Sequence, residues 1–366
     1  MSASRIWRAL FPVALVALLA VVPLLSIDIP GLFNGPLDSP GTLQLLATCL
    51  VFAGVALTYD LLFGFTGLLS FGHALPFAVG VYIAAIALTR WEWGLPATLG
   101  LTALVALALP LVLGSISLRV GGIAFAMVTL AFAQAGAILV GKNPDGLTGG
   151  EEGLGLSFDR VPDAFVGVLN TKNLYWLALV YAAIVFVAVR WAVESSPGRV
   201  WQAIRENERR VEVIGLRPGG FKLMAFVLAS FLASAGGVVY LLVIGGATPQ
   251  VTSPNFTLAL LVMVVIGGTG TRWGAMLGGV LYTYLDQRLL SLAGSDAVEG
   301  LPGALRTPLS EPLFVLGTLF ILLVFFLPGG LSGLLTGRAG RGVRRLDRTL
   351  RPRGATGVVG EPEEVS

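Results

Sequence analysis

The sequence contains no charged residue between Asp60 and Arg90, and similar uncharged, apolar runs recur along the chain. A helix needs about 20 consecutive apolar residues to cross the hydrocarbon core of a bilayer. Charged residues make up 12% of the chain, whereas they make up roughly 25% of an ordinary soluble domain. The chain is therefore predicted to be an all-α, polytopic membrane protein.

About ten transmembrane helices are expected from these runs, in one transmembrane domain over residues 1–337. The run after Arg5 and Arg8 resembles a signal peptide in its charge pattern. It is longer than a typical cleaved core and no clear cleavage site follows it, which predicts an uncleaved first span. The stretch from Asn255 to Leu285 is interrupted only by Arg272, so its division into two spans is the least distinct. The expected spans are residues 9–28, 41–59, 61–89, 94–118, 120–141, 174–189, 223–247, 255–271, 273–290 and 312–336.

Lys and Arg are unevenly distributed between the two sides of the membrane that these spans define. With the N-terminus inside, the inner segments hold 18 of the 24 basic residues and the outer segments hold 6. Cytoplasmic loops carry such an excess, so both termini are expected in the cytoplasm. The tail over residues 338–366 is basic as far as Gly354 and is expected to be disordered after it. We interpret its basic part as an anchor to anionic membrane lipid rather than a nucleic-acid site.

The inner loop at about residues 190–222 is basic and has a helical pattern. Ser196 as N-cap, Pro197 at the first helical position and Gly215 with Pro218 as a stop predict a helix over 197–214. The apolar residues expected on one face of this helix are Val200, Ile204, Val211 and Ile214, and Glu206 and Arg210 are spaced as an ion pair. Such a helix could dock into a groove of another protein or lie on the lipid surface. The spacing alone leaves both interpretations open.

Motifs for catalysis or for a cofactor are incomplete in this sequence. Residues 136–143, GAILVGKN, nearly match a phosphate-binding loop, but Asn143 replaces the hydroxyl residue that binds Mg²⁺ and the segment ends a span. ATP hydrolysis by this chain is therefore not expected. One histidine and one cysteine make no metal cluster, and Ser70 with His73 lacks a nearby carboxylate and a nucleophile elbow. We expect a transport protein that binds no cofactor itself.

The span that contains His73, the only histidine, is predicted to be broken near residues 70–76. Glycines precede this point, and Pro76 fits best in the first turn of a helix. The 14 residues from Pro76 to Thr89 would extend about 21 Å, which is less than the roughly 30 Å core. Broken helices recur at transport sites, although close glycine packing between helices is an alternative explanation. The candidate translocation residues are Thr66, Ser70, Gly72, His73, Thr129 and Gln134.

Buried ionisable groups in membrane spans often mark proton relays, so a proton-coupled secondary carrier is an alternative class. His73 is the one titratable side chain well inside a span, because Asp60 and Asp286 fall at span ends. A proton relay normally needs several proton-binding groups, and one histidine alone is a poor relay. We therefore expect His73 to hold the helix break together by hydrogen bonding, with substrate contact as the second interpretation and proton relay as the third.

Five motifs in order resemble the permease subunits of bacterial and archaeal ATP-binding-cassette importers for branched-chain amino acids, most closely the longer of their two permease types. The resemblance covers about Leu57 to Leu285. Two departures stand out, because Leu68 replaces a Gln of many relatives and RPGGFK at 217–222 replaces a more apolar-aromatic segment. The motifs are GFTGLLSFGHALPFAVGVY, GIAFAMVTLAFAQ, LTGGEEGLG, SSPGRVWQAIRENERRVEVIG and VVIGGTGTRWGAMLGG.

The resemblance implies an importer in the bacterial or archaeal cytoplasmic membrane. A second permease subunit, two ATP-hydrolysing subunits that bind ATP and Mg²⁺, and an extracytoplasmic substrate-binding protein would be the partners. The outer loop at about 142–173 contains the motif with Thr148, Gly149 and Gly150. Relatives also import urea, short amides and other small solutes, so the solute does not follow from the resemblance. The residues that it assigns to coupling with the ATPases are Arg199, Arg205, Glu206, Asn207, Arg209 and Arg210.

Overall fold

A computed structural model describes residues 14–28, 33, 35–293, 312–326 and 329–335 of the protein. Residues 9–13 of the expected first span and the tail at 338–366 lie outside this part. Each of the ten ranges that were expected to span the membrane contains a helix in the described residues. The all-α, polytopic class predicted from the sequence is thereby confirmed.

Long helices form the body of the protein, and a long loop joins the helix that ends at Lys142 to the helix that begins at Thr171. Among the described residues, five helical segments are long and apolar enough to cross a membrane, namely Pro40–Thr66, Leu95–Ser117, Ile123–Lys142, Thr171–Glu194 and Pro218–Ile244. The helices after the first, Ala14–Leu24, are α2 (Pro40–Asp60), α3 (Ala74–Thr89), α4 (Leu95–Ser117), α5 (Ile123–Lys142), α6 (Thr171–Glu194), α7 (Ser196–Val213), α8 (Pro218–Ile244), α9 (Pro254–Gly267), α10 (Arg272–Ala293), α13 (Pro312–Phe326) and α14 (Gly330–Leu335).

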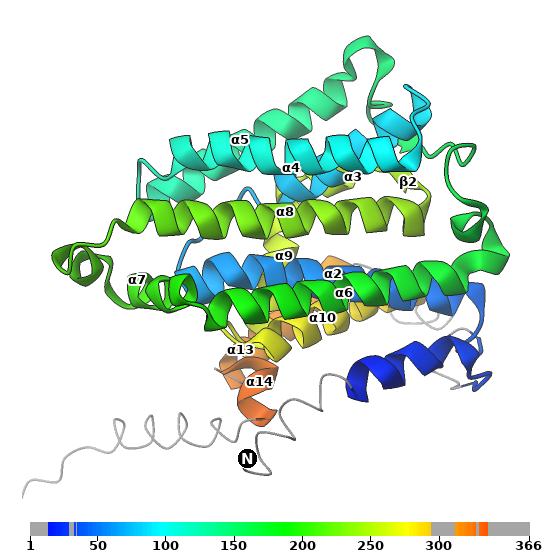
Figure 1. Ribbon diagram of the computed structural model, residues 1–366. Coiled ribbons are helices and arrows are strands. Elements are labelled where there is room, and N and C mark those ends of the chain that lie inside the picture. The colour runs from blue at the N-terminus through cyan, green and yellow to red at the C-terminus, as the bar shows by residue number, and fades with distance from the viewer. Residues whose placement is uncertain (1–13, 29–32, 34, 294–311, 327–328, 336–366) are drawn as a thin grey trace, which may run out of the picture.

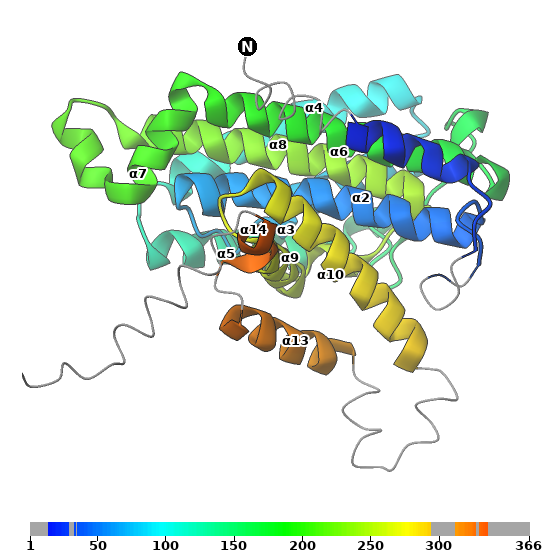
Figure 2. The same ribbon diagram turned by 90° about the horizontal axis from the view of Figure 1, so that it is seen from below.

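Helix α2 lies at the centre of the bundle, between α6, α8 and α10. Its residues from Ala47 to Asp60 are buried apart from the half-buried Phe52, as expected for a helix that is apolar on all sides. Helix α8 runs between α4 and α6 (Figure 1), whereas α13 lies at the edge of the molecule beside α10 (Figure 2).

Helices α3 and α8 approach each other closely through glycines. A Cβ atom on Gly80 would lie 2.0 Å from the carbonyl oxygen of Ser234, and one on Gly237 would lie 2.2 Å from that of Phe77. The Ser234 hydroxyl also donates a hydrogen bond of 2.6 Å to the carbonyl of Pro76. Small residues and interhelical hydrogen bonds of this kind hold membrane helices together.

Two expected spans are divided in the structure. The span at 61–89 is broken as predicted: Leu61–Thr66 forms a π-helical turn, residues 67–73 are not helical, and α3 places Pro76 in its first turn. The range 312–336 was expected as one span, but it contains two helices, α13 and α14. At the start of α14, Gly330 has a φ of 61°, a left-handed conformation that does not continue a right-handed helix.

The two expected loops lie at opposite ends of the bundle. Helix α7 projects at one end, and the ribbon of β1 (Leu154–Gly155) and β2 (Gly246–Ala247) lies at the other (Figure 1). The strands pair antiparallel, with Leu154 opposite Ala247. The ribbon joins the loop between α5 and α6 to the segment that follows α8.

Candidate functional site

The break in the third expected span begins with the π-helical turn that follows α2. Gly67 ends this turn with a φ of 77° and a ψ of 17°, and the Leu68 N–H donates to the Leu62 carbonyl at 2.8 Å. The Thr66 hydroxyl donates to the Leu61 carbonyl at 2.8 Å, so this side chain is bonded to its own turn. Single π turns occur mostly inside helices and often at functional sites.

Side chains from α2 and α5 hold the backbone of the break. The Tyr59 hydroxyl donates to the carbonyl of Ser70 at 3.1 Å, and the Phe71 N–H donates to Thr129 Oγ1 at 3.2 Å. Within the loop, the Gly72 N–H donates to Ser70 Oγ at 3.2 Å. These bonds satisfy backbone groups that have no helical partner, as buried backbone requires. A Cβ atom on Gly72 would lie 2.4 Å from the Thr129 carbonyl oxygen, so only glycine fits here.

His73 lies in the packed interior, with 1% of its surface exposed. Its Nε2 is 3.0 Å from Thr58 Oγ1, and the Thr58 hydroxyl donates its proton to the Val55 carbonyl at 2.7 Å. Because a hydroxyl has one proton, Nε2–H is the donor to Thr58. The Tyr59 ring packs edge-on against the imidazole at a centroid distance of 5.3 Å. His73 therefore ties the start of α3 to α2.

The structure brings most of the candidate translocation residues together. Ser70, Gly72, His73 and Thr129 are buried side by side around the break. Gln134 is apart from them, on an exposed face of α5 that also contains the exposed Met127 and Ile138.

Three residues that hold the break were not identified from the sequence. Thr58 and Tyr59 belong to the preceding span, and Thr257 is 183 residues away from the Ala74 N–H that donates to its hydroxyl at 3.0 Å. Thr58 and Thr257 are polar residues inside apolar runs, and this pattern could have indicated that each forms a hydrogen bond in the interior. The pattern does not indicate which group is the partner.

Helix α7 is docked onto the bundle by one face. Trp201, Ile204 and Val211 are buried, and the Trp201 Nε1–H donates to the Phe221 carbonyl at 2.7 Å. The helix begins one residue earlier than predicted, because the N-cap is Ser195, whose Oγ accepts from the Gly198 N–H at 3.4 Å. The stop expected at 215–218 is correct for α7, and Pro218 is itself the first residue of α8.

A break inside α7 overturns part of the predicted face. Asn207 has an extended conformation, with a φ of −163° and a ψ of 102°, and its Oδ1 accepts from the Arg210 N–H at 3.1 Å. This break changes the rotational phase of the last turn. Ile214 is consequently 72% exposed rather than part of the docked face, and Glu206 and Arg210 form no ion pair in the part of the chain that the structure describes.

Arg205 differs from the other candidate coupling residues, because its guanidinium turns toward the bundle. Its Nη1 donates a hydrogen bond to the Gly64 carbonyl in the π-helical turn. Beside it, Asp60 Oδ1 accepts from the Gly270 N–H at 2.8 Å. A Cβ on Gly64 would lie 1.9 Å from that carboxylate oxygen. Arg205 is nevertheless exposed as a whole residue, as are the other candidates Arg199, Glu206, Asn207, Arg209 and Arg210.

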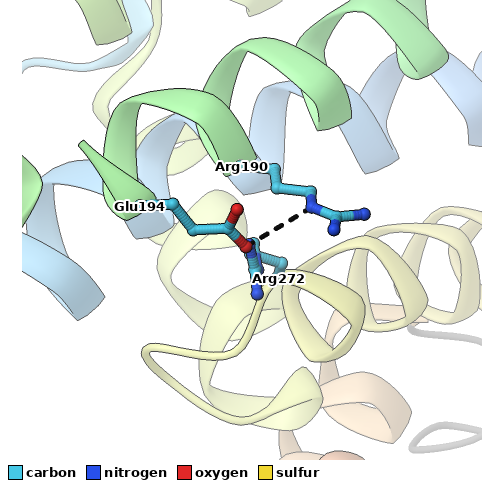
Figure 3. A network of polar contacts seen from close by, with 3 residues as sticks. All are labelled: Arg190, Glu194 and Arg272. Carbon is cyan, nitrogen blue, oxygen red and sulfur yellow. Dashed lines mark hydrogen bonds and ion pairs between the residues drawn. The ribbon is translucent and has the colours of Figure 1, made fainter. Parts of the chain in front are cut away.

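A second polar contact lies immediately before α7 (Figure 3). Glu194 Oε1, at the end of α6, is 2.7 Å from Arg272 Nη1 and 3.4 Å from Arg190 Nε. These side chains are largely accessible to solvent, so each pair contributes at most about 1 kcal/mol. The contact joins the end of α6 to the start of α10.

The turn that contains Thr148, Gly149 and Gly150 is built around Asn143, the residue that broke the match to a phosphate loop. Asn143 has a φ of 48°, and its Oδ1 accepts from the N–H groups of Thr148 at 2.9 Å and Gly149 at 3.0 Å. The Thr148 hydroxyl donates to the Val140 carbonyl at 2.7 Å. Gly149 and Gly150 have φ values of 77° and 63°, which favour glycine. The turn is therefore fixed to the end of α5.

The arrangement combines a broken helix in the interior, a docked helix at one end and a fixed turn at the other. A model of the family described as "Branched-chain amino acid transport system / permease component" matches residues 41–327. The chain belongs to this family. The resemblance drawn from the five sequence motifs is thereby confirmed.

Curated relatives of this chain are named as permease proteins of transport or import systems. The high-affinity branched-chain amino acid transport system permease protein LivM of Escherichia coli is 27% identical over 304 residues, which cover 76% of this chain and 68% of the relative. The probable LivM permease of Methanocaldococcus jannaschii is 25% identical over 313 residues, which cover 76% and 89%. The autoinducer 2 import system permease protein LsrC of Klebsiella pneumoniae is 31% identical over 152 residues, which cover 39% and 42%. No solved structure matches the chain.

Proposed function

We propose that this permease is the membrane-spanning subunit of an ATP-binding-cassette importer for branched-chain amino acids. The observation that carries the proposal is the family match over residues 41–327, together with relatives whose names specify branched-chain amino acid transport. The chain acts by alternating access, without hydrolysing ATP itself.

The ATP-hydrolysing partners bind at α7. One face of this helix is locked into the bundle through Trp201, and the opposite face presents Arg199, Arg209 and Arg210 to solvent. A helix with one anchored and one free face fits a groove of another protein. ATP and Mg²⁺ are bound in these partners, two per importer, and their closure moves α7. Because α7 is docked, its movement reaches the bundle.

The translocation path runs past the break before α3, beside a second permease subunit. The residues around Ser70 and His73 are held by hydrogen bonds from three other helices, so a shift of one helix changes the shape of the break. The exposed face of α5 with Gln134 faces the path or the second subunit, because an amide is poorly accommodated in lipid. The turn at Thr148 meets an extracytoplasmic substrate-binding protein, and both termini lie in the cytoplasm.

A different small solute is the second candidate, and one observation favours it. A relative named for autoinducer 2 import shares 31% identity over 152 residues, so this family includes permeases with other solutes. Urea or a short amide would be handled by the same architecture. The substrate-binding protein of the proposed importer decides between them. Thermal stabilisation of that protein by leucine, isoleucine or valine supports the proposal, and stabilisation only by urea, amides or another solute contradicts it.

Coupling through α7 is tested by charge reversal on its exposed face. Arg209→Glu with Arg210→Glu is expected to reduce co-purification of the ATP-hydrolysing subunits. Arg160→Glu, at an exposed position at the opposite end of the molecule, is the matched control. If the ATPases remain bound to the reversed variant and uptake is unchanged, α7 is not the coupling segment.

A further inference from the structure

Helix α9 connects the break before α3 to the region of α7. At its start, Thr257 is fully buried and its Oγ1 accepts from the Ala74 N–H, the first residue of α3, at 3.0 Å. No helical carbonyl partner is available to this N–H, because the first four N–H groups of a helix lack one. Thr257 therefore fixes the position of the α3 N-terminus.

The other end of α9 leads into the turn that touches α7. In this turn the Gly270 N–H donates to Asp60 Oδ1 at 2.8 Å. A Cβ on Gly270 would lie 2.7 Å from Arg205 Nη1 and 3.1 Å from the Gly64 carbonyl oxygen. Arg205 therefore rests against this turn while it binds Gly64. A movement of α7 displaces the turn directly.

Helix α9 is short and closely packed, so it moves as a rigid body. Its 14 residues extend about 21 Å. Its N-terminus is capped by Ser253, whose Oγ accepts from the Phe256 N–H at 3.4 Å. A Cβ on Gly278 of α10 would lie 1.9 Å from the Met263 carbonyl oxygen of α9. Packing this close opposes sliding of α9 along α10.

The covalent route between the same two regions is less suited to transmit a displacement. It runs through residues 61–73, which include Gly64, Gly67 and Gly72 and leave helical geometry after Thr66. Residues 67–73 lack the repeated backbone hydrogen bonds of a helix, so this segment bends more readily than α9 when one end is displaced.

We propose that α9 is a rigid strut that transmits the movement of α7 from Arg205 at one end to the N-terminus of α3 through Thr257 at the other. Thr257 is a positioning residue for the transport cycle. The inference rests on the proposed importer function, and it adds the route by which ATP-driven movement reaches the break. The strut therefore predicts energetic coupling between Arg205 and Thr257.

The test uses the assembled importer in proteoliposomes and measures solute molecules transported per ATP hydrolysed. Thr257→Val removes the hydroxyl and is expected to lower this ratio by roughly fivefold or more, the lower end of typical coupling between sites. Thr257→Ala must give the same loss, and Thr257→Ser, which keeps the hydroxyl, must restore the ratio. Thr102→Val is the matched control, because this buried hydroxyl donates only to Thr98 within its own helix α4.

A double variant makes the test specific to the strut. When Arg205→Gln is combined with Thr257→Val, the ratio is expected to fall no further than in the lower of the two single variants, because both interrupt one route. If the loss in the double variant equals the product of the two single losses, the two residues act independently and the strut is contradicted. The strut is also contradicted if Thr257→Val leaves the number of solute molecules per ATP unchanged in an importer that transports with ATP. Absence of ATP-driven transport in the unsubstituted importer overturns the proposed function and the strut with it.

Discussion

The imidazole Nε2 of His73 donates a hydrogen bond of 3.0 Å to Thr58 Oγ1, which joins the start of α3 to the central helix α2. The chain's only histidine is thus a link between two helices that the break would otherwise separate. This hydrogen bond agrees with the expectation that His73 holds the helix break together.

His73→Gln is expected to keep ATP-coupled uptake, because the glutamine amide retains an N–H donor for Thr58. His73→Ala removes the donor and leaves a cavity, which should destabilise the protein by about 2–4 kcal/mol. Thermal unfolding of the purified chain in detergent measures the second effect. Loss of uptake in an assembled His73→Gln importer would instead indicate substrate contact or gating.

Gly64→Ala is expected to destabilise the junction of α2 with the π-helical turn. The added Cβ would lie 1.9 Å from Asp60 Oδ1 and 2.4 Å from the Gly270 nitrogen, so the contact between them must open. The cost is on the order of 3 kcal/mol or more, as for overpacking combined with a lost buried hydrogen bond. Gly41→Ala is the matched control, because no atom lies within 4 Å of its Cβ position. Equal unfolding temperatures for the two variants would contradict the geometry.

Asn207→Ala is expected to weaken the second part of α7. It removes the Oδ1 that caps the Arg210 N–H, at a cost of roughly 0.5–2 kcal/mol. Alanine also favours continuous helix, which rotates Arg209 and Arg210 relative to Trp201. Reduced co-purification of the ATP-hydrolysing subunits checks this, with the exposed Gln202→Ala as control. If both variants retain the ATPases equally, the break has no part in their binding.

Asn143→Ala is expected to loosen the turn at Thr148 without unfolding the bundle. The amide oxygen accepts hydrogen bonds from two backbone N–H groups, and each is worth about 1 kcal/mol. Faster cleavage in residues 144–153 by an added protease measures the loosening. Asn173→Ala, which removes one exposed bond to the Ala164 carbonyl, is the control. Identical cleavage rates would show that Asn143 does not hold the turn.

Helix positions could be predicted from the sequence because each depends on a local pattern. Long apolar runs located α2, α4, α5 and α8, and Pro76 with its neighbouring glycines located the break. Two helix boundaries were missed. Gly330 has a left-handed φ of 61° at the start of α14, and Asn207 has an extended conformation inside α7, where its Oδ1 accepts from the Arg210 N–H.

The hydrogen-bond partners within the candidate site could not be predicted from local patterns, because they are far apart in the sequence. The sequence identified Ser70, His73 and Thr129 as polar residues in apolar surroundings. It did not identify Thr257, because the Ala74 N–H that this hydroxyl meets is 183 residues away. Arg205 was assigned to coupling with its basic neighbours, and nothing in the sequence indicated that its guanidinium also binds Gly64 of its own chain.

The central claim is that ATP hydrolysis in partner subunits drives transport through this chain. The most direct measurement is uptake of labelled leucine into proteoliposomes, with the substrate-binding protein outside, under two conditions. The account predicts accumulation when the complete importer has ATP and Mg²⁺ at its ATPase subunits, and none when this chain alone is given a proton gradient. Accumulation by the chain alone under the gradient, lost in His73→Ala, would contradict the account and establish a proton-coupled carrier.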